Sequence, residues 1–203
     1  MVAGGSGARI GCAKQYEVVG SQRVLDHAVA AARAASDGVV IVVPSDDAVA
    51  EGGVAGGATR SESVRAGLAA VPNDATIVCV HDAARPFASS TLFEAVIDAV
   101  RNGADGAVPG VAVADTIKRI DAHNIVVETP PRSSLVAVQT PQAFRASSLR
   151  AAHAAGGDAT DDAALVEAAG CRVVVVDGEP INRKITHPHD LAWARALAEA
   201  EGR

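Results

Sequence analysis

The chain has 203 residues, of which 49% are hydrophobic and 21% are charged, enough apolar material for one sizeable core. Its net charge of −6 argues against a protein that binds nucleic acid through a basic face. No run of about 18 apolar residues occurs, and the first residues lack a charged leader, so we expect neither a membrane span nor a secretion signal. Three widely spaced cysteines (Cys12, Cys79 and Cys171) form no disulfide framework, which predicts free thiols in a reducing cytoplasm.

The predicted elements alternate between helices and strands. In chain order, we expect a helix at 22–35, a strand at 38–43, a helix at 60–71, a strand at 76–80, a helix at 91–102, strands at 106–113, 124–128 and 135–139, helices at 145–155 and 161–169, a strand at 171–176 and a helix at 188–201. Thr91 and Glu94 predict a capping box, and Pro188 fits a first helical turn after Thr186. The strongest strands are apolar on both faces, as parallel strands covered by helices are. The pattern predicts one α/β domain over 1–203 with an open, doubly wound, mostly parallel, Rossmann-like sheet.

The segment 115–132 interrupts this alternation. Apolar and polar residues alternate over 116–120 and 125–128 around a turn at 121–124, which predicts an extended β-hairpin. Because an isolated two-stranded hairpin is at best marginally stable, we expect this protruding arm to pack on a second subunit and to make the protein a homodimer.

A glycine-rich loop lies near the N-terminus at residues 3–9, with Arg9 at its end and Lys14 five residues further on. Glycines let backbone N–H groups approach phosphate oxygens, and the two cations add positive charge. The loop has neither the P-loop spacing nor the dinucleotide-binding spacing. A glycine-rich terminus is also consistent with a merely flexible end, and this alternative stays open on the loop alone.

A second candidate site is the heptad Val-His-Asp-Ala-Ala-Arg-Pro at 80–86, which follows a predicted strand directly. Ligands of open α/β sheets bind beyond the carboxyl ends of the strands. Asp82 could hold a metal ion or hydroxyl groups there, and Arg85 could hold an anion. A surface loop with a salt bridge is the alternative. Several further segments, taken singly, fit turns and helix caps: Asp115–Lys118, Arg132, 139–142, 160–162 and 182–186.

These pieces together resemble the 2-C-methyl-D-erythritol 4-phosphate cytidylyltransferase family of the non-mevalonate isoprenoid pathway. The matching segments span nearly the whole chain in the family's order: AGGSGAR (3–9) with KQY (14–16), GGATRSESV (56–64), VHDAARP (80–86), DTIKR (115–119), QTPQAF (139–144), TDDA (160–163) and NRKITHPHDL (182–191). Ribitol-5-phosphate cytidylyltransferases share most of these segments, so that activity stays open as an alternative.

The resemblance implies transfer of CMP from CTP to the methylerythritol phosphate, with release of pyrophosphate. It implies that Arg9 and Lys14 stabilise the transition state. It also implies that Lys184 and Thr116 hold the acceptor phosphate, together with Arg132 from the partner subunit. Mg²⁺ is expected to bridge the triphosphate, with Asp82 as a candidate ligand. The other implied contacts are Ala3, Gly4, Gly5, Ser6, Gly7, Gly57, Ala58 and Ser63 for the nucleotide, and Asp82, Ala83, Arg85, Thr140 and Thr160 for the acceptor substrate.

The proposed reaction needs no general base from the protein. A phosphomonoester has a second pKa of about 6, so it is largely dianionic at neutral pH and can attack the α-phosphorus directly. The remaining task is to align two anions and stabilise the charge that develops between them. The absence of a Ser-His-Asp or Cys-His pattern is therefore no objection to this chemistry.

The chain also departs from the family pattern. Only Met1 and Val2 precede Ala3, where the family has an apolar strand, so we expect a central strand to be largely missing and its neighbours to be unpaired. An added upstream strand should then raise the melting temperature. The segment between Arg9 and Lys14 is shortened, Ala58 replaces a common acidic residue, and Glu179 replaces a common Asp. A catalytically weakened homologue that binds nucleotide or another subunit stays open for this reason.

Overall fold

The computed structural model describes residues 1–5 and 13–202. Its α-helices are α1 (Val24–Ala35), α2 (Arg60–Ala70), α3 (Ser90–Arg101), α4 (Ala146–Ala154), α5 (Asp162–Ala168) and α6 (Pro188–Ala200). Its strands are β1 (Val18–Val19), β2 (Gln22–Arg23), β3 (Val42–Val43), β4 (Val54–Ala55), β5 (Ile77–Val80), β6 (Gly106–Ala112), β7 (Arg119–Ile120), β8 (Val126–Glu128), β9 (Val136–Val138), β10 (Gln142–Arg145) and β11 (Val173–Asp177). Short 3₁₀ turns occur at η1 (Lys14–Tyr16), η2 (Ser45–Asp47) and η3 (Arg132–Ser134).

The central sheet is mixed. Its strands follow the order β11-β6-β10-β5, and β9 also pairs with β6. β11 is parallel to β6, whereas β10 is antiparallel to both of its neighbours and β9 is antiparallel to β6. The α/β class is therefore confirmed, but the expectation of a mostly parallel sheet is wrong for this part. The error arises at β10, whose residues Gln-Ala-Phe-Arg include no β-branched side chain and gave no strand signal.

A second parallel pair, β3–β4, lies on the other side of β5. The first residues of the chain connect the two parts, because Val2 forms parallel bridges to both Val42 and Asp82. Val2 N–H donates to the His81 carbonyl at 2.8 Å, and Ala3 N–H donates to the Val42 carbonyl at 2.7 Å. Val2 therefore occupies the position between β3 and β5 as a single bridging residue.

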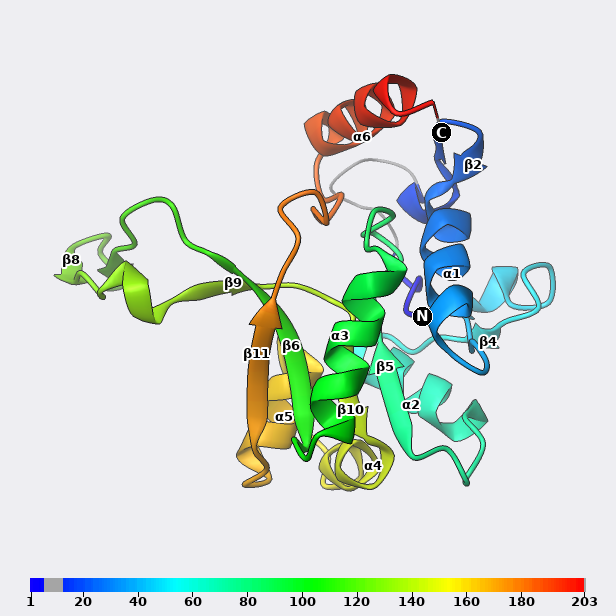
Figure 1. Ribbon diagram of the computed structural model, residues 1–203, viewed down its shortest axis with the longest axis horizontal. Coiled ribbons are helices and arrows are strands. Elements are labelled where there is room, and N and C mark those ends of the chain that lie inside the picture. The colour runs from blue at the N-terminus through cyan, green and yellow to red at the C-terminus, as the bar shows by residue number, and fades with distance from the viewer. Residues whose placement is uncertain (6–12, 203) are drawn as a thin grey trace.

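Helices flank the sheet on both faces (Figure 1). α3 packs against β5, β6, β10 and β11 with α1 beside it, and α4 and α5 pack on the opposite face with α2 next to α4. The largest buried cluster lies under α2, α4 and α5 and includes Leu68, Phe144 and Leu149. α6 packs on β1 through a separate cluster around Phe87 and Ile185. The doubly wound order stays an expectation.

Two predicted helix starts can be compared with the structure. The predicted capping box at Thr91 is wrong, because α3 is capped by Ser89, whose Oγ accepts from Leu92 N–H at 3.0 Å. Glu179 strengthens this cap, since its carboxylate accepts from both the N–H and the hydroxyl of Ser89. Pro188 is confirmed as the first residue of α6, with His187 as the cap.

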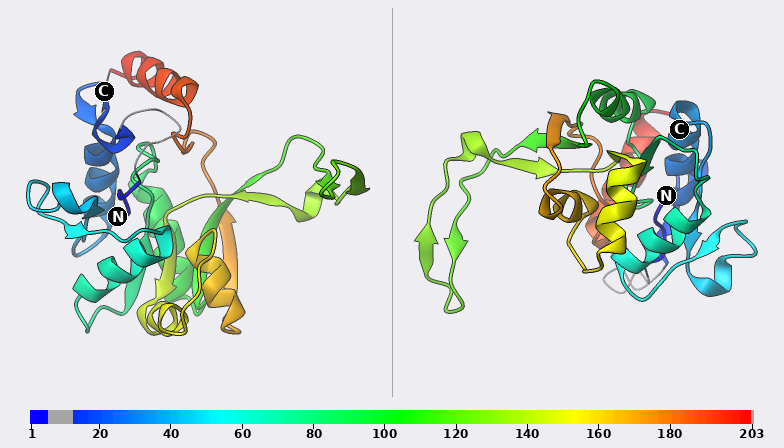
Figure 2. Two further views of the ribbon diagram at one scale, coloured as in Figure 1. Left: turned by 180° about the vertical axis from the view of Figure 1, so that it is seen from behind. Right: turned by 90° about the horizontal axis from the view of Figure 1, so that it is seen from below.

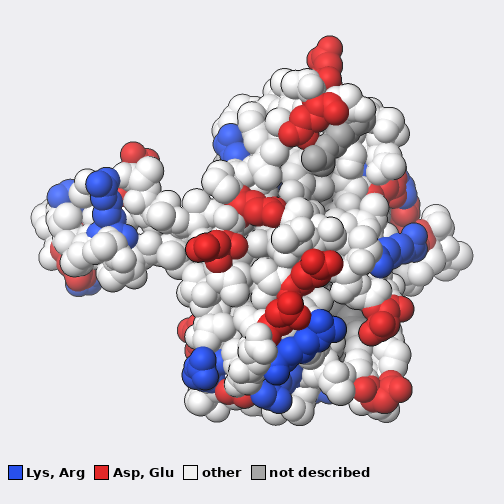
Figure 3. Space-filling view, viewed as in Figure 1, with Lys and Arg blue, Asp and Glu red and all other residues white. Residues whose placement is uncertain are grey.

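The predicted arm is seen as a β7–β8 hairpin that stands away from the body (Figures 1 and 2). Its strands are shorter than expected, and its turn lies at 121–124, where Asn124 has φ 62°. Asp121 Oδ1 closes this turn by accepting from the N–H groups of His123 and Ile125, both at 2.9 Å. Acidic and basic side chains are interspersed over the face seen in Figure 3, including the arm. Among the described residues, no helix is both long and apolar enough to cross a membrane.

Candidate active site

The candidate site lies beyond the carboxyl end of β5 and beside Val2, where several connecting segments meet. The segment 81–85 follows β5, and Thr140 precedes β10. The segment 182–186 reaches the same place, because Ile185 N–H donates to the Ala84 carbonyl at 2.8 Å. Ala83 N–H in turn donates to the Val2 carbonyl at 3.0 Å, which fixes the start of the glycine-rich loop beside this segment. The sequence prediction of a site at this edge is consistent with that arrangement.

Asp82 is the centre of a cluster of charges. Its carboxylate accepts from Lys184 Nζ at 2.6 Å and from Arg60 Nε at 3.3 Å. Burial acts to raise the pKa of Asp82, but the nearby charges of Lys184 and Arg60 outweigh it and hold that pKa well below its ordinary value. Asp82 is therefore a permanent anion that positions two cations.

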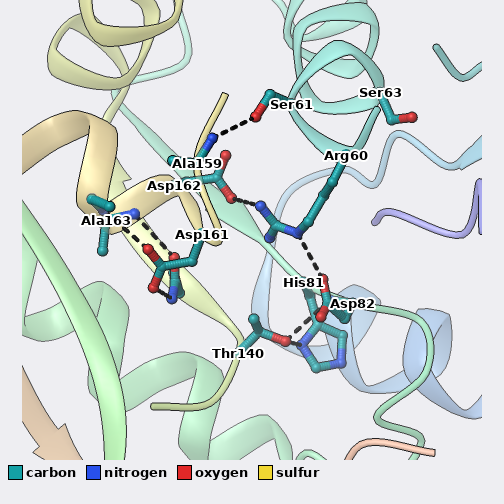
Figure 4. Close-up of polar contacts among 12 residues, drawn as sticks. Arg60, Ser61, Ser63, His81, Asp82, Thr140, Ala159, Asp161, Asp162 and Ala163 are labelled. Carbon is teal, nitrogen blue, oxygen red and sulfur yellow. Dashed lines mark hydrogen bonds and ion pairs between the residues drawn. The ribbon is translucent and has the colours of Figure 1, made fainter. Parts of the chain in front are cut away.

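Arg60 connects this cluster to a second buried acid (Figure 4). Its Nη1 donates to Asp162 Oδ2 at 2.7 Å, and His153 Nε2 lies 2.9 Å from Asp162 Oδ1. Burial acts to lower the pKa of Arg60, whereas Asp82 and Asp162 raise it, with a net shift upward. A guanidinium can bridge two carboxylates in this way because its donors are arranged in a planar fork.

His81 and Thr140 hold the backbone on which Asp82 sits. Thr140 Oγ1 accepts from Asp82 N–H at 3.0 Å and lies 3.0 Å from His81 Nδ1. Burial lowers the pKa of His81 to about 4, so the imidazole is neutral at physiological pH. The Thr140 hydroxyl then donates to Nδ1, and the proton on Nε2 is directed to the Arg85 carbonyl, 3.2 Å away. Both side chains are buried, which makes them positioning residues in this structure.

Arg85 braces the segment that carries Lys184. Its Nη1 donates to the Asn182 carbonyl at 2.8 Å, while Asn182 Nδ2 donates to the Thr140 carbonyl at 2.9 Å. Within the described residues, the buried Nε of Arg85 has no hydrogen-bond partner. An anionic ligand is one group that could satisfy such a buried donor.

Lys14 and Lys184 belong to the same neighbourhood. Lys14 Nζ donates to the carbonyl of Ile185, the residue after Lys184, at 2.8 Å. The Lys184 side chain keeps 40% of its surface exposed even though its ammonium contacts Asp82. The two lysines that the resemblance assigned to phosphate contacts are thus brought to one rim of the site.

The predicted nucleotide loop is built around Ser63. Its Oγ accepts from Gly57 N–H at 3.1 Å and donates to the Thr59 carbonyl at 3.0 Å, which ties the loop to the first turn of α2. A Cβ on Gly57 would lie 2.3 Å from Glu62 Cβ, so only glycine fits there. A Cβ on Gly4 would lie 3.3 Å from Ser63 Oγ, which places this loop against the glycine-rich loop. Ala58 is exposed at the tip.

Other predicted site residues lie elsewhere or outside the described part. Thr116 and Arg132 are exposed on or beside the arm, and Arg132 Nη1 donates to the Ala114 carbonyl at 2.6 Å. The arm itself stands away from the body of the chain (Figure 2). Thr160 is exposed next to the start of α5. Ser6, Gly7 and Arg9 lie outside the described residues, so their predicted contacts stay predictions.

Sequence reasoning missed the roles of Arg60, Asp162 and His153. Arg60 and Asp162 lie in the GGATRSESV and TDDA segments, so the segments were found but the pairing between them was not. The residue types themselves were the available signal, because an acid and an arginine at the starts of two helices need charged or polar partners when they are buried. His153 lies in an otherwise ordinary amphipathic helix and gave no signal.

The described residues do not form a metal site. No group of three His, Cys, Asp or Glu side chains suited to an ion occurs among them. Asp82, the predicted ligand, already has its two oxygens paired with Lys184 and Arg60, so it fits an added cation poorly. We therefore derive no step from a metal ion held by the protein.

Comparisons with known proteins decide the family. The model of the 2-C-methyl-D-erythritol 4-phosphate cytidylyltransferase family matches residues 1–200. The chain belongs to this family. A relative of that name from Rhodococcus jostii is 46% identical over 97% of this chain and 92% of its own length. A structure of 4-diphosphocytidyl-2C-methyl-D-erythritol synthase from Anaerococcus prevotii has a TM-score of 0.85 and 32% identity, covering 98% of this chain and 95% of that one.

A further relative is longer than this chain. The bifunctional enzyme IspD/IspF of Anaeromyxobacter dehalogenans is 48% identical over 98% of this chain, yet the chain spans only 56% of the length of that relative. The cytidylyltransferase family thus includes members that carry this unit within a larger protein.

Proposed function

We propose that this protein transfers CMP from CTP to 2-C-methyl-D-erythritol 4-phosphate and releases pyrophosphate. The observation that carries the proposal is the cluster of Lys184, Asp82 and Arg60 at the rim shared with Lys14, in a chain that matches the family over 1–200. This rim offers fixed positive charge beside the start of a glycine-rich loop. Such a site suits a reaction between two phosphate groups.

In this reaction an oxygen of the acceptor phosphate forms a bond to the α-phosphorus of CTP, and the bond from that phosphorus to the β-phosphate oxygen breaks. Pyrophosphate leaves with the electron pair of the broken bond. Lys184, held at 2.6 Å from Asp82, would orient the acceptor phosphate, and Lys14 with Arg9 would stabilise the negative charge that develops. Gly57 and Ser63 would bound the cytosine pocket, in which a purine is too large.

The arm supports a proposal about subunit organisation. Its apolar side chains are unusually exposed for their type, including Ile120 at 52%, Ile125 at 60% and Val126 at 52%. Exposed apolar surface of this kind is typical of an interaction site. We expect a two-fold homodimer in which each arm packs on the other chain, so that Arg132 of the partner subunit reaches the acceptor phosphate. The single-domain organisation and the cytoplasmic location stay predictions.

Mg²⁺ is expected to enter bound to CTP, because this ion usually keeps several waters and is held partly by substrate phosphates. Since the described residues lack a dedicated metal cluster, removal of divalent ions by EDTA should abolish turnover without changing the melting temperature. A lower melting temperature in EDTA would instead indicate a resident metal ion.

The test of the proposed function is a coupled pyrophosphate-release assay with CTP and either methylerythritol phosphate or ribitol 5-phosphate. We expect pyrophosphate and the CDP-alcohol with the first acceptor, and much slower release with the second. Faster release with ribitol 5-phosphate would assign the alternative acceptor. If a folded protein releases no pyrophosphate from CTP with either acceptor, the chain is a non-catalytic homologue and the proposal is wrong.

A further inference from the structure

The segment that carries Lys184 has no regular secondary structure of its own. It lies between β11, which ends at Asp177, and α6, which begins at Pro188. A side chain on such a segment keeps a defined position when other parts of the protein bond to the backbone around it. The buried amides of Gln139 and Asn182, at 7% and 0% exposure, supply such bonds here.

Gln139 directs its whole amide at this segment. Its Nε2 donates to the carbonyl oxygens of Glu179 at 2.8 Å and Asn182 at 3.2 Å. Its Oε1 accepts from Glu179 N–H at 3.1 Å and from Asn182 Nδ2 at 3.3 Å. A Cβ on Gly178 would lie 2.9 Å from this Oε1, so glycine at that position leaves room for the amide. Because both donors and both acceptor positions of the amide are used, a side chain without an amide at 139 would leave buried backbone groups unpaired.

Asn182 completes the contact from within the segment. Its backbone carbonyl accepts from Arg85 Nη1 at 2.8 Å. Its Nδ2 donates to the Thr140 carbonyl at 2.9 Å and to Gln139 Oε1 at 3.3 Å. Within the described residues its Oδ1 has no hydrogen-bond partner, so the two donated bonds hold the side chain. A reversed amide would set an oxygen against two acceptors, and the orientation of the side chain is therefore fixed by donation.

The same amide pair joins this segment to the strand that returns from the arm. Gln139 directly follows β9, and its N–H donates to the Pro109 carbonyl at 2.8 Å, which extends the ladder between β9 and β6. On the other edge of β6, Gly178 N–H donates to the Gly110 carbonyl at 2.9 Å. The Gln139 amide therefore connects two chain segments that lie on opposite edges of β6.

Lys184 lies between two fixed points of the backbone. Asn182 is two residues before it, and Ile185 N–H, directly after it, donates to the Ala84 carbonyl at 2.8 Å. Between these points the Lys184 ammonium reaches Asp82 at 2.6 Å. Loss of the bonds at Asn182 would free the backbone on one side of Lys184 and leave the other side attached.

We propose that Gln139 and Asn182 position Lys184 for the acceptor phosphate, an inference that rests on the proposed transfer reaction. They act through the backbone of the segment, so they are positioning residues and not catalytic ones. A displacement of about 1 Å at a reacting group can cost about 100-fold in rate. The nucleotide loop at 57–63 is anchored separately on α2, so the pair should affect use of the acceptor and not binding of CTP.

The test compares the unaltered protein with Asn182→Asp, which keeps the shape of the side chain but replaces the donating group by an oxygen that faces two acceptors. We expect kcat/KM for methylerythritol phosphate to fall about 10–100-fold, whereas the Kd of CTP stays within about twofold. The control is Arg150→Ala, which removes donated bonds to two backbone carbonyls at 3.0 and 3.1 Å and should change neither value. If Asn182→Asp does not fold, Gln139→Met carries the same comparison, because it leaves Asn182 unaltered.

Hydrogen exchange reports on the segment without using activity. The amide of Ile185 should exchange at least about tenfold faster in Asn182→Asp, while the amide of Ala146, bonded to the Thr76 carbonyl at 2.9 Å, serves as the reference. Unchanged exchange at Ile185, equal losses for the acceptor and for CTP, or faster exchange with unchanged use of the acceptor would each overturn the proposal. If the unaltered protein releases no pyrophosphate with either acceptor, the proposed function fails, and exchange at Ile185 alone decides whether the amide pair holds this segment.

Discussion

The charge cluster around Asp82 and the arm at 115–132 place their functional side chains in opposite environments. In the cluster, Asp82, Arg60 and Asp162 are largely buried and each charge has a partner within 3.3 Å. In the arm, Arg132 and the apolar residues of the hairpin are exposed. The cluster is complete within one chain, whereas the arm offers surface that one chain does not cover. The difference shows that positioned charge can be built inside one subunit, whereas the proposed homodimer would complete the acceptor end of the site with a second copy.

The buried cluster should be most sensitive at Arg60. Arg60→Ala leaves Asp82 with one cation fewer and Asp162 without its arginine, so we expect a loss of about 3–5 kcal/mol in unfolding free energy. Arg60→Lys should cost less, because it keeps the charge but loses the fork. The control is Arg101→Ala, which removes an exposed pair with Asp98 at 3.0 Å and should cost at most about 1 kcal/mol. Urea denaturation measures all three, and similar losses for Arg60→Ala and Arg101→Ala would contradict the account of the cluster.

The rim of the site should be most sensitive in turnover at Lys14. Lys14→Ala removes a positioned charge and should reduce turnover by about 100–1000-fold, the usual effect of losing one preorganised group. Arg9→Ala is expected to act in the same direction. The matched control is Arg195→Ala, which breaks an exposed pair with Glu17 at 2.7 Å and should leave turnover unchanged. Near-normal turnover in a folded Lys14→Ala protein would remove this rim from the proposed phosphate site.

A smaller effect is expected from pH. Burial lowers the pKa of His81 from 6.5 to about 4. Between these two pH values the unfolded chain therefore binds a proton at His81 that the folded chain does not bind. The free energy of unfolding is therefore highest above pH 6.5, where His81 is neutral in both states, and it decreases as the pH falls toward 4. The pKa of Asp82 lies below its ordinary value of 3.8, so its contribution is lost only at lower pH. Melting temperatures at pH 7 and 5 should differ less for His81→Asn than for the unaltered protein, and an identical difference would refute this assignment.

The sequence correctly predicted those helices and strands whose own residues carry the periodic or apolar pattern. The helical periods placed α2, α5 and α6 to within a residue or two, and the apolar runs placed β5 and β11. The short strand β10 and the β1–β2 hairpin were missed because pairing with neighbours, rather than composition, makes them strands. The capping error at Thr91 has the same origin, since Ser89 is favoured by its contact with the distant Glu179.

For the candidate site, family resemblance supplied the segments but not their mutual contacts. Asp82, Lys184 and Lys14 were named, and the structure brings them to one place. The bridge from Arg60 to Asp162 joins residues 102 positions apart, a separation over which one sequence carries no pairing information. In the proposed homodimer, the contact between Arg132 and the acceptor phosphate is made across the two subunits, so neither the sequence nor one chain determines it.

The most direct measurement of this division between subunits is complementation between two inactive variants. Arg132→Ala alone should impair use of the polyol phosphate more than CTP binding, because only the acceptor phosphate loses its bidentate partner. When Arg132→Ala chains exchange with Lys14→Ala chains, each mixed dimer regains one site with both native groups. Equal mixing should then restore roughly one quarter of the unaltered activity, since half of the dimers are mixed and each has one of two sites intact. No recovery, with exchange of tagged subunits demonstrated in the same sample, would contradict the account and assign Arg132 to its own chain's site or to none.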